Sequence, residues 1–163
     1  MKELPEILKT LYDAKVDFVV IGGTAMQLQG SAYVTQDIDF CYARTPQNIK
    51  RLTAALKPHY PVLRGAPAGL LFTFDARTVT QGMNFTLSTD LGDLDFLGEV
   101  AGLGAFEQVK AAADLQVIDG MEIAVLSLVG LIKSKKAAGR PKDLYVLPEL
   151  EGLEQLKRKT GAK

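Results

Sequence analysis

Two aspartates separated by one residue are the first feature of this sequence that could do chemistry. They lie in Asp37-Ile38-Asp39-Phe40, and the side chains of residues i and i+2 of a strand point to the same face. Two carboxylates held that close repel each other unless a cation neutralises them. The pair therefore predicts a site for a hard divalent cation such as Mg²⁺, and the alternative is an acidic strand edge exposed to solvent.

A third acid with apolar neighbours occurs later in the chain, in Asp93-Leu94-Asp95-Phe96. A carboxylate placed between core residues is unfavourable unless it is paired or bound to metal. Asp93 and Asp95 share a face of the predicted strand, so either could be the third metal ligand. Asp95 is preferred, because Leu94 and Phe96 bracket it within the strand. Asp93 follows Gly92 at a turn, where capping of the turn is the expected role.

A pair of glycines, Gly22-Gly23, follows the apolar run Phe18–Ile21 and precedes Thr24. Glycine lets a phosphate approach the backbone closely, and a helix that starts here offers free N–H groups. Taken alone, the pattern is more often a tight turn from strand to helix than a phosphate site.

A basic segment, Lys133–Lys142, carries five basic residues in ten. Within it, Lys135 lies four residues after Leu131 and three after Ile132, so it continues their apolar stripe along a helix. Such a lysine either extends to solvent or reaches an anion. The other cations suit a solvated helix end or an approach path for phosphates.

Composition excludes several classes of protein. The chain has 163 residues, 47% of them hydrophobic and 23% charged, which is ordinary for a globular protein. Nineteen basic residues balance nineteen acidic ones, which argues against a binder of nucleic acid or anionic membranes driven by net charge. One cysteine and one histidine, His59, exclude an internal disulfide and the usual structural zinc sites.

The N-terminus carries Glu3 and Glu6 and no apolar core, so no signal peptide is expected. No apolar run reaches the ~18 residues of a membrane span. These observations predict a cytoplasmic protein that makes no membrane contact. They predict nothing about its oligomeric state.

Apolar spacing and breakers predict an α/β (α+β) fold, a mixed sheet with flanking helices. The expected helices cover 3–15, 24–29, 45–57, 126–138 and 143–159. The expected strands cover 18–21, 37–43, 70–74, 83–87, 94–97 and a hairpin of 115–118 with 121–125. Residues 98–104 are expected to form a flexible loop. The chain is predicted to be one domain over 1–163, with a core of about 15–125 and C-terminal helices of about 126–160.

The order of these features resembles the nucleotidyltransferase superfold of DNA polymerase β. That pattern is an apolar residue, Gly, then Gly or Ser, followed by Asp-x-Asp and a distant Asp between apolar residues. Here it corresponds to Ile21-Gly22-Gly23, Asp37-Ile38-Asp39 and Leu94-Asp95-Phe96. The resemblance implies the nucleotidyltransferase fold with a helical C-terminal segment.

More narrowly, the sequence looks like the small bacterial nucleotidyltransferases of the AbiEii toxin-like group. Lys135 followed by Arg140-Pro141-Lys142-Asp143 resembles the C-terminal lysine motif of that group. Tyr33 stands where members of the group often carry an arginine.

The resemblance implies a role for each predicted residue. The catalytic and metal-binding residues would be Asp37, Asp39 and Asp95, holding two Mg²⁺ ions, with Mn²⁺ as an alternative. The nucleotide-binding residues would be Gly22, Gly23, Thr24, Lys135 and Arg140, which would hold the phosphates of an NTP such as ATP.

Two functions follow as expectations. The first is a Mg²⁺-dependent enzyme that transfers NMP from an NTP to a hydroxyl of RNA, tRNA or protein, in a toxin–antitoxin or phage-defence system with a cognate antitoxin. The alternative is a catalytically weak or inactive member of the same fold that binds a nucleotide or a partner protein.

Overall fold

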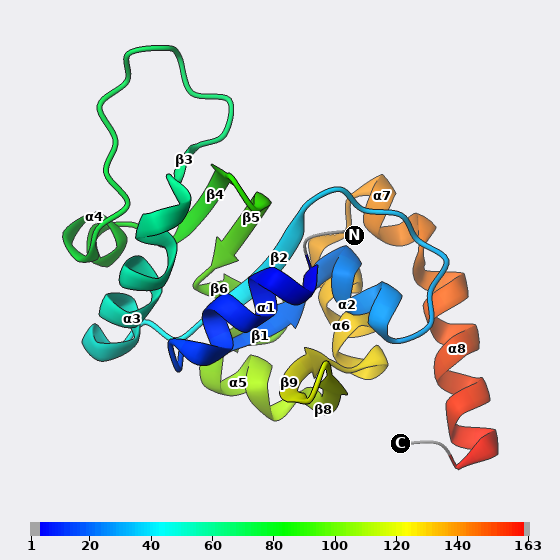
Figure 1. Ribbon diagram of the computed structural model, residues 1–163. Coiled ribbons are helices and arrows are strands. Elements are labelled where there is room, and N and C mark those ends of the chain that lie inside the picture. Colours follow the sequence, from blue (N-terminus) through cyan, green and yellow to red (C-terminus); the bar gives the residue numbers. More distant parts are fainter. Residues whose placement is uncertain (1–3, 162–163) are drawn as a thin grey trace.

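A mixed seven-stranded sheet forms the centre of the computed structural model, which describes residues 4–161 (Figure 1). Its strands are β1 (Phe18–Ile21), β2 (Ile38–Tyr42), β3 (Val62–Leu63), β4 (Asn84–Thr89), β5 (Gly92–Leu97), β8 (Ala113–Ile118) and β9 (Met121–Leu126). Their order in the sheet is β3-β4-β5-β2-β1-β9-β8. β2 pairs parallel with β5, and β1 pairs antiparallel with β2 and parallel with β9. The predicted mixed sheet is confirmed.

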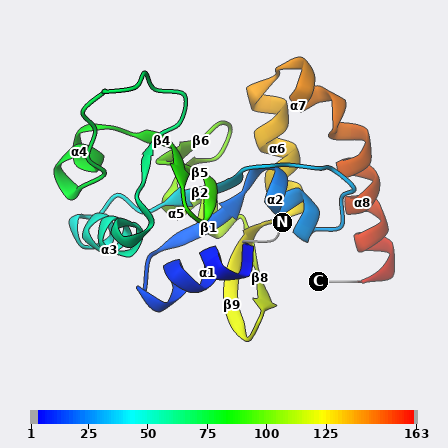
Figure 2. The same cartoon turned by 45° about the horizontal axis from the view of Figure 1, so that its top comes forward.

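Helices cover this sheet at both ends (Figures 1 and 2). They are α1 (Leu4–Asp13), α2 (Gly22–Leu28), α3 (Pro46–Leu56), α4 (Ala76–Gln81), α5 (Phe106–Ala111), α6 (Leu128–Ala138), α7 (Pro141–Tyr145) and α8 (Leu147–Thr160). α3 and α4 pack together at the β3–β4 end, whereas α6, α7 and α8 gather beside α2 at the other end. Among the helices described over 4–161, none has both the length and the apolar character needed to cross a bilayer.

Aromatic packing on one face of the sheet determines where the acids point. Phe40 of β2 stacks on Phe96 of β5 with ring centroids 5.1 Å apart, and it meets Phe18 of β1 edge to face at 5.5 Å. Since side chains alternate along a strand, burial of Phe40 and Phe96 directs Asp39 and Asp95 to the opposite face. The core on one face therefore positions the candidate site on the other.

One predicted strand is wrong. Residues 70–74 form no strand but belong to a long excursion between β3 and α4 (Figure 1). The apolar run Leu70-Leu71-Phe72 suggested a strand, yet Leu71 is 98% exposed. Phe74 is buried in the core, and Phe72 packs against it from a partly buried position. The neighbour of β4 at this edge of the sheet is instead the short β3.

Other boundaries differ locally. The interval 98–104 contains a small hairpin of β6 (Glu99–Val100) and β7 (Gly104–Ala105) rather than an unstructured loop. The last predicted helix is divided into α7 and α8 at Val146, close to Pro148, which has no N–H to continue a helix. The division into a core of about 15–125 and C-terminal helices of about 126–160 stays a prediction.

Candidate active site

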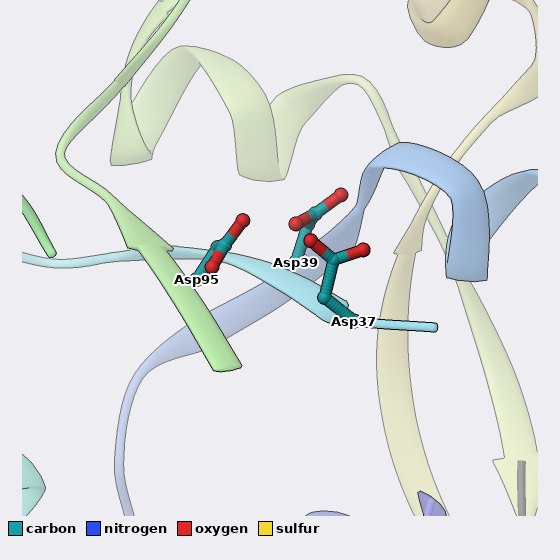
Figure 3. A group of neighbouring side chains, drawn as sticks. All are labelled: Asp37, Asp39 and Asp95. Carbon is teal, nitrogen blue, oxygen red and sulfur yellow. The ribbon is translucent and has the colours of Figure 1, made fainter. Parts of the chain in front are cut away.

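The three aspartates singled out in the sequence lie together (Figure 3). The parallel pairing of β2 with β5 places Asp39 opposite Asp95, and Asp37 directly precedes β2. One carboxylate oxygen of each aspartate lies within 4.8 Å of the other two. The predicted convergence of Asp37, Asp39 and Asp95 is therefore confirmed, whereas their roles in catalysis stay a prediction.

Burial and neighbouring charges raise the pKa of two of these acids, Asp39 and Asp95. Burial, together with the charges of Asp95 and Asp37, raises the pKa of Asp39 to about 7. Burial also raises the pKa of Asp95, although a hydrogen bond from Arg64 opposes the shift. Three carboxylate oxygens at this spacing are a donor set that suits a hard divalent cation, because such an ion would relieve both the repulsion and the burial penalty.

Two threonines orient the first aspartate. The Thr35 hydroxyl lies 3.0 Å from Asp37 Oδ1 and 3.1 Å from the Asp37 carbonyl oxygen. The Thr24 hydroxyl is fully buried and lies 3.5 Å from the same carbonyl oxygen. Thr24, expected to bind phosphate, thus lies beneath the backbone that carries Asp37.

The Gly22–Gly23 turn packs directly against the acids. Gly22 has φ +62°, which disfavours other residues, and a Cβ there would overlap the Asp39 carboxylate. A Cβ on Gly23 would lie 2.9 Å from Cε1 of Tyr33 and 2.8 Å from Cβ of Thr35. Both glycines are required because the backbone approaches its neighbours so closely.

Lys135 and Arg140 are held by an aspartate that the sequence analysis gave no role. Lys135 Nζ lies 3.4 Å from Asp143 Oδ1, and Arg140 Nε donates to Asp143 Oδ2 at 2.6 Å. The Asp143 side chain is 1% exposed. Burial opposes its ionisation, but hydrogen bonds from Arg140 and the charge of Lys135 hold its pKa below the usual range. Two signals in the sequence could have revealed this role: Asp143 ends the lysine motif, and it lies three residues after Arg140, where it caps α7.

One cavity of about 300 Å³ brings the acids and the cations together. Its lining includes Gly23, Tyr33, Asp37, Asp39, Asp95, Lys135, Arg140 and Lys142. An adjoining hollow of about 160 Å³ adds Gly22. Hollows of about 560 and 790 Å³ lie elsewhere on the molecule and also carry charged residues. Over residues 4–161, however, the only acids whose carboxylate oxygens converge as a possible metal site are Asp37, Asp39 and Asp95. Chemistry rather than volume therefore identifies the candidate site.

Arg64 is a further member of the site that the sequence did not indicate. Its guanidinium NH2 lies 2.5 Å from Asp95 Oδ1 and 3.7 Å from Asp37 Oδ2. NH1 lies 3.9 Å from Asp93 Oδ2. No nearby motif marked this arginine, because it reaches the acids from the far side of β4 and only the folded sheet brings them together.

Comparison with known proteins identifies the fold. No protein-family model matches the sequence, and no curated protein matches it either. A structure described as a candidate nucleotidyltransferase from Thermotoga maritima is similar, with a TM-score of 0.53, 17% identity, and coverage of 99% of this chain and 95% of that one. The lincosamide antibiotic adenylyltransferase LnuA, with lincomycin bound, has a TM-score of 0.59, 16% identity, and coverage of 93% and 96%.

These similarities confirm the nucleotidyltransferase fold expected from the sequence. They do not test the narrower resemblance to the AbiEii toxin-like group, which stays a prediction.

Replacing Gly22 with alanine should destabilise the protein by about 1–3 kcal/mol, because alanine would be strained at this φ and would displace the Asp39 carboxylate. Denaturant unfolding measures the effect. Gly152→Ala in α8 is the matched control, because nothing lies within 4 Å of its added Cβ, and alanine should stabilise a helix by up to about 1 kcal/mol. Equal stability of Gly22→Ala and the wild type would contradict the close packing of the turn.

Asp39→Asn should remove a pH-dependent loss of stability in protein freed of metal by EDTA. The pKa of Asp39 in the folded protein, about 7, exceeds the ordinary aspartate value of 3.8, so the folded state binds the proton more tightly. The stabilisation that the proton on Asp39 gives the folded state is complete below about pH 4 and is lost as pH rises to 7. Between pH 4 and 7 the Tm of the wild type should therefore fall relative to that of the variant. Above pH 7 the difference between the two Tm values should stay constant. The exposed Asp13→Asn should leave the wild-type profile unchanged.

Proposed function

We propose that this protein is a metal-dependent nucleotidyltransferase that transfers NMP from an NTP to an acceptor hydroxyl. One observation carries the proposal: the carboxylates of two paired parallel strands, and a third directly before β2, share one cavity with basic residues of α6 and α7 beside a Gly-Gly turn. The two solved structures with this fold that are described as transferring nucleotides support it.

Asp37, Asp39 and Asp95 would hold Mg²⁺ or Mn²⁺, as two ions in the proposed mechanism. When bound, the metal would neutralise these acids and polarise the phosphoryl oxygens. Thr35 fixes the Asp37 carboxylate and Thr24 its backbone carbonyl, so both threonines act by positioning a ligand. We assign Asp95 to the acceptor side because it lies on β5, next to the open edge formed by β4 and β3.

The triphosphate would lie toward α6 and α7. Lys135 is 20% exposed in its side chain and Arg140 is 60% exposed, and Asp143 fixes both of them. They would offset the charge of the phosphates, with Lys142 at the rim. The Gly22–Gly23 turn packs against the acids, and Gly23 lines the same cavity, so its backbone would contact the same phosphates.

The transfer needs no covalent intermediate on the protein. The acceptor oxygen forms a bond to the α-phosphorus while the bond from the α-phosphorus to the bridging oxygen breaks, and pyrophosphate leaves. The proton of the acceptor hydroxyl passes to Asp95 and then to solvent. Catalysis of this kind depends on positioning and electrostatics.

The acceptor defines the finer proposal. The AbiEii-like motif at Lys135–Asp143 favours RNA, tRNA or protein as acceptor and a cytoplasmic toxin–antitoxin or phage-defence role with a cognate antitoxin. The similarity in fold to LnuA makes a small molecule with a hydroxyl group the second class of acceptor to test.

A second candidate function is nucleotide or partner binding without turnover. The observation that favours it is Tyr33, which is 40% exposed and lines the cavity where the related group often has an arginine. A phenol cannot supply the positive charge that an arginine would give to the triphosphate.

A transfer assay tests the two functions. The protein with Mg²⁺ and α-labelled NTPs should label a component of total RNA, a cell lysate or an antibiotic panel. Asp37→Asn with Asp39→Asn should lower labelling at least about a hundredfold, or about 2.7 kcal/mol, because the metal ligands are lost. The double variant should also lose the rise in Tm that Mg²⁺ with NTP gives the wild type. A Tm rise without any labelling would favour the binding function.

Lys135→Ala should weaken NTP binding by more than about tenfold, or ~1.4 kcal/mol, because this lysine faces the cavity. Lys133→Ala is the matched control on the same helix, since Lys133 is exposed, and it should change binding little. Isothermal titration measures both. Equal small effects would remove Lys135 from the nucleotide site.

A further inference from the structure

Arg64 reaches the acids across the outer part of the sheet. It directly follows β3, and its backbone N–H donates to the carbonyl oxygen of Thr86 in β4 at 3.0 Å. Thr86 lies opposite Asp95 in the pairing of β4 with β5. The Arg64 side chain therefore extends over β4 toward Asp95, from the edge of the sheet that faces away from Lys135 and Arg140.

The guanidinium of Arg64 contacts three carboxylates at once, unlike a single surface ion pair. It lies 2.5 Å from Asp95 Oδ1, 3.7 Å from Asp37 Oδ2 and 3.9 Å from Asp93 Oδ2. NH1 also donates to the carbonyl oxygen of Leu87 at 3.4 Å. The side chains of Arg64 and Asp95 are 28% and 16% exposed, so water screens their contact only in part.

Two of the candidate metal ligands also contact Arg64. Asp37 and Asp95 belong to the group of three that could hold a metal ion, and both lie within 4 Å of the Arg64 guanidinium. A divalent cation at these oxygens and a guanidinium hydrogen-bonded to them repel each other and compete for the same lone pairs. Binding of one must therefore weaken binding of the other.

We propose that Arg64 is a latch on the metal site, which holds Asp95 and Asp37 until a divalent cation displaces it. The inference rests on the proposed metal-binding role of the three acids. In the latched state the arginine offsets part of their repulsion, so the protein is stable with the acids close together. The latch also raises the concentration of free cation needed to load the site.

Arg64 further joins the metal site to the excursion that follows it. Residues 64–75 run from the end of β3 to the N-cap of α4 at Asp75, and Leu70 and Leu71 in their middle are exposed. Arg64 is the first residue of this segment, and its backbone stays bonded to Thr86 of β4. The excursion therefore starts from a fixed point beside the acids, and only the Arg64 side chain needs to move when a cation binds.

Titration of Mn²⁺ without nucleotide, followed by the EPR signal of free Mn²⁺, tests the latch on the full chain. Arg64→Gln should bind Mn²⁺ at least about tenfold more tightly than the wild type, because no guanidinium competes for the carboxylates. Arg64→Lys keeps the charge but not the two-pronged donor geometry, so it should lie between them. Arg77→Gln, an exposed arginine on α4, should bind as the wild type does.

A second readout keeps the test independent of affinity alone. In EDTA, Arg64→Gln should have a lower Tm than the wild type, and Mn²⁺ should raise the Tm of the variant by more. Circular dichroism checks that Arg64→Gln and Arg64→Lys fold. If Arg64→Gln does not fold, the Mn²⁺ affinity of Arg64→Lys relative to the wild type decides the test.

The outcomes separate the latch from the proposed function. If the wild type binds Mn²⁺ through Asp37 and Asp39, and Arg64→Gln binds it equally or more weakly, the latch is wrong while the metal site stands. If neither protein binds more Mn²⁺ than the Asp37→Asn, Asp39→Asn double variant, both the metal site and the latch are wrong. Tight binding by Arg64→Gln alone supports both.

Discussion

Electrostatic repulsion among Asp37, Asp39 and Asp95 is the constraint on which the rest of this structure depends. The parallel register of β2 and β5 forces Asp39 and Asp95 into adjacent positions, and burial of Phe40 and Phe96 on the other face prevents the strands from turning the acids away. The core thus holds like charges together. Burial makes the charged form of Asp39 still less favourable, and together burial and the neighbouring charges raise its pKa to about 7. Such an arrangement is relieved either by a proton on Asp39 or by nearby cations.

Those cations are arranged on two sides of the acids. On the side of α6 and α7, Lys135 and Arg140 are fixed by the buried Asp143, so positive charge is positioned near the acids without being neutralised by them. On the side of β3, Arg64 contacts the acids directly. Because Lys135 and Arg140 bond Asp143 rather than the three acids, a cavity that could hold an anion remains between them and the acids. Arg64 bonds Asp95 itself and so takes the place of a cation.

The acids and Lys135 could be predicted from the sequence because local rules suffice for them. Alternation along a strand places Asp37 and Asp39 on one face, apolar neighbours mark Asp95, and helical spacing aligns Lys135 with Leu131. Arg64 could not be predicted, because its contact depends on the order β3-β4-β5 in the sheet. The run Leu70-Leu71-Phe72 misled for the opposite reason: it has the composition of a strand but no strand beside it to pair with.

The parallel pairing of β2 with β5 also has a consequence for how the protein is made. The acids of the site are separated by a long stretch of chain that includes α3, the excursion and β4, so the ribosome releases Asp37 and Asp39 well before Asp95. Contacts between such distant segments form late, since loop closure must come first. Before β5 emerges, the nascent chain carries only Asp37 and Asp39 of the group. The three-carboxylate cluster that could hold a metal ion forms only when β5 has paired with β2.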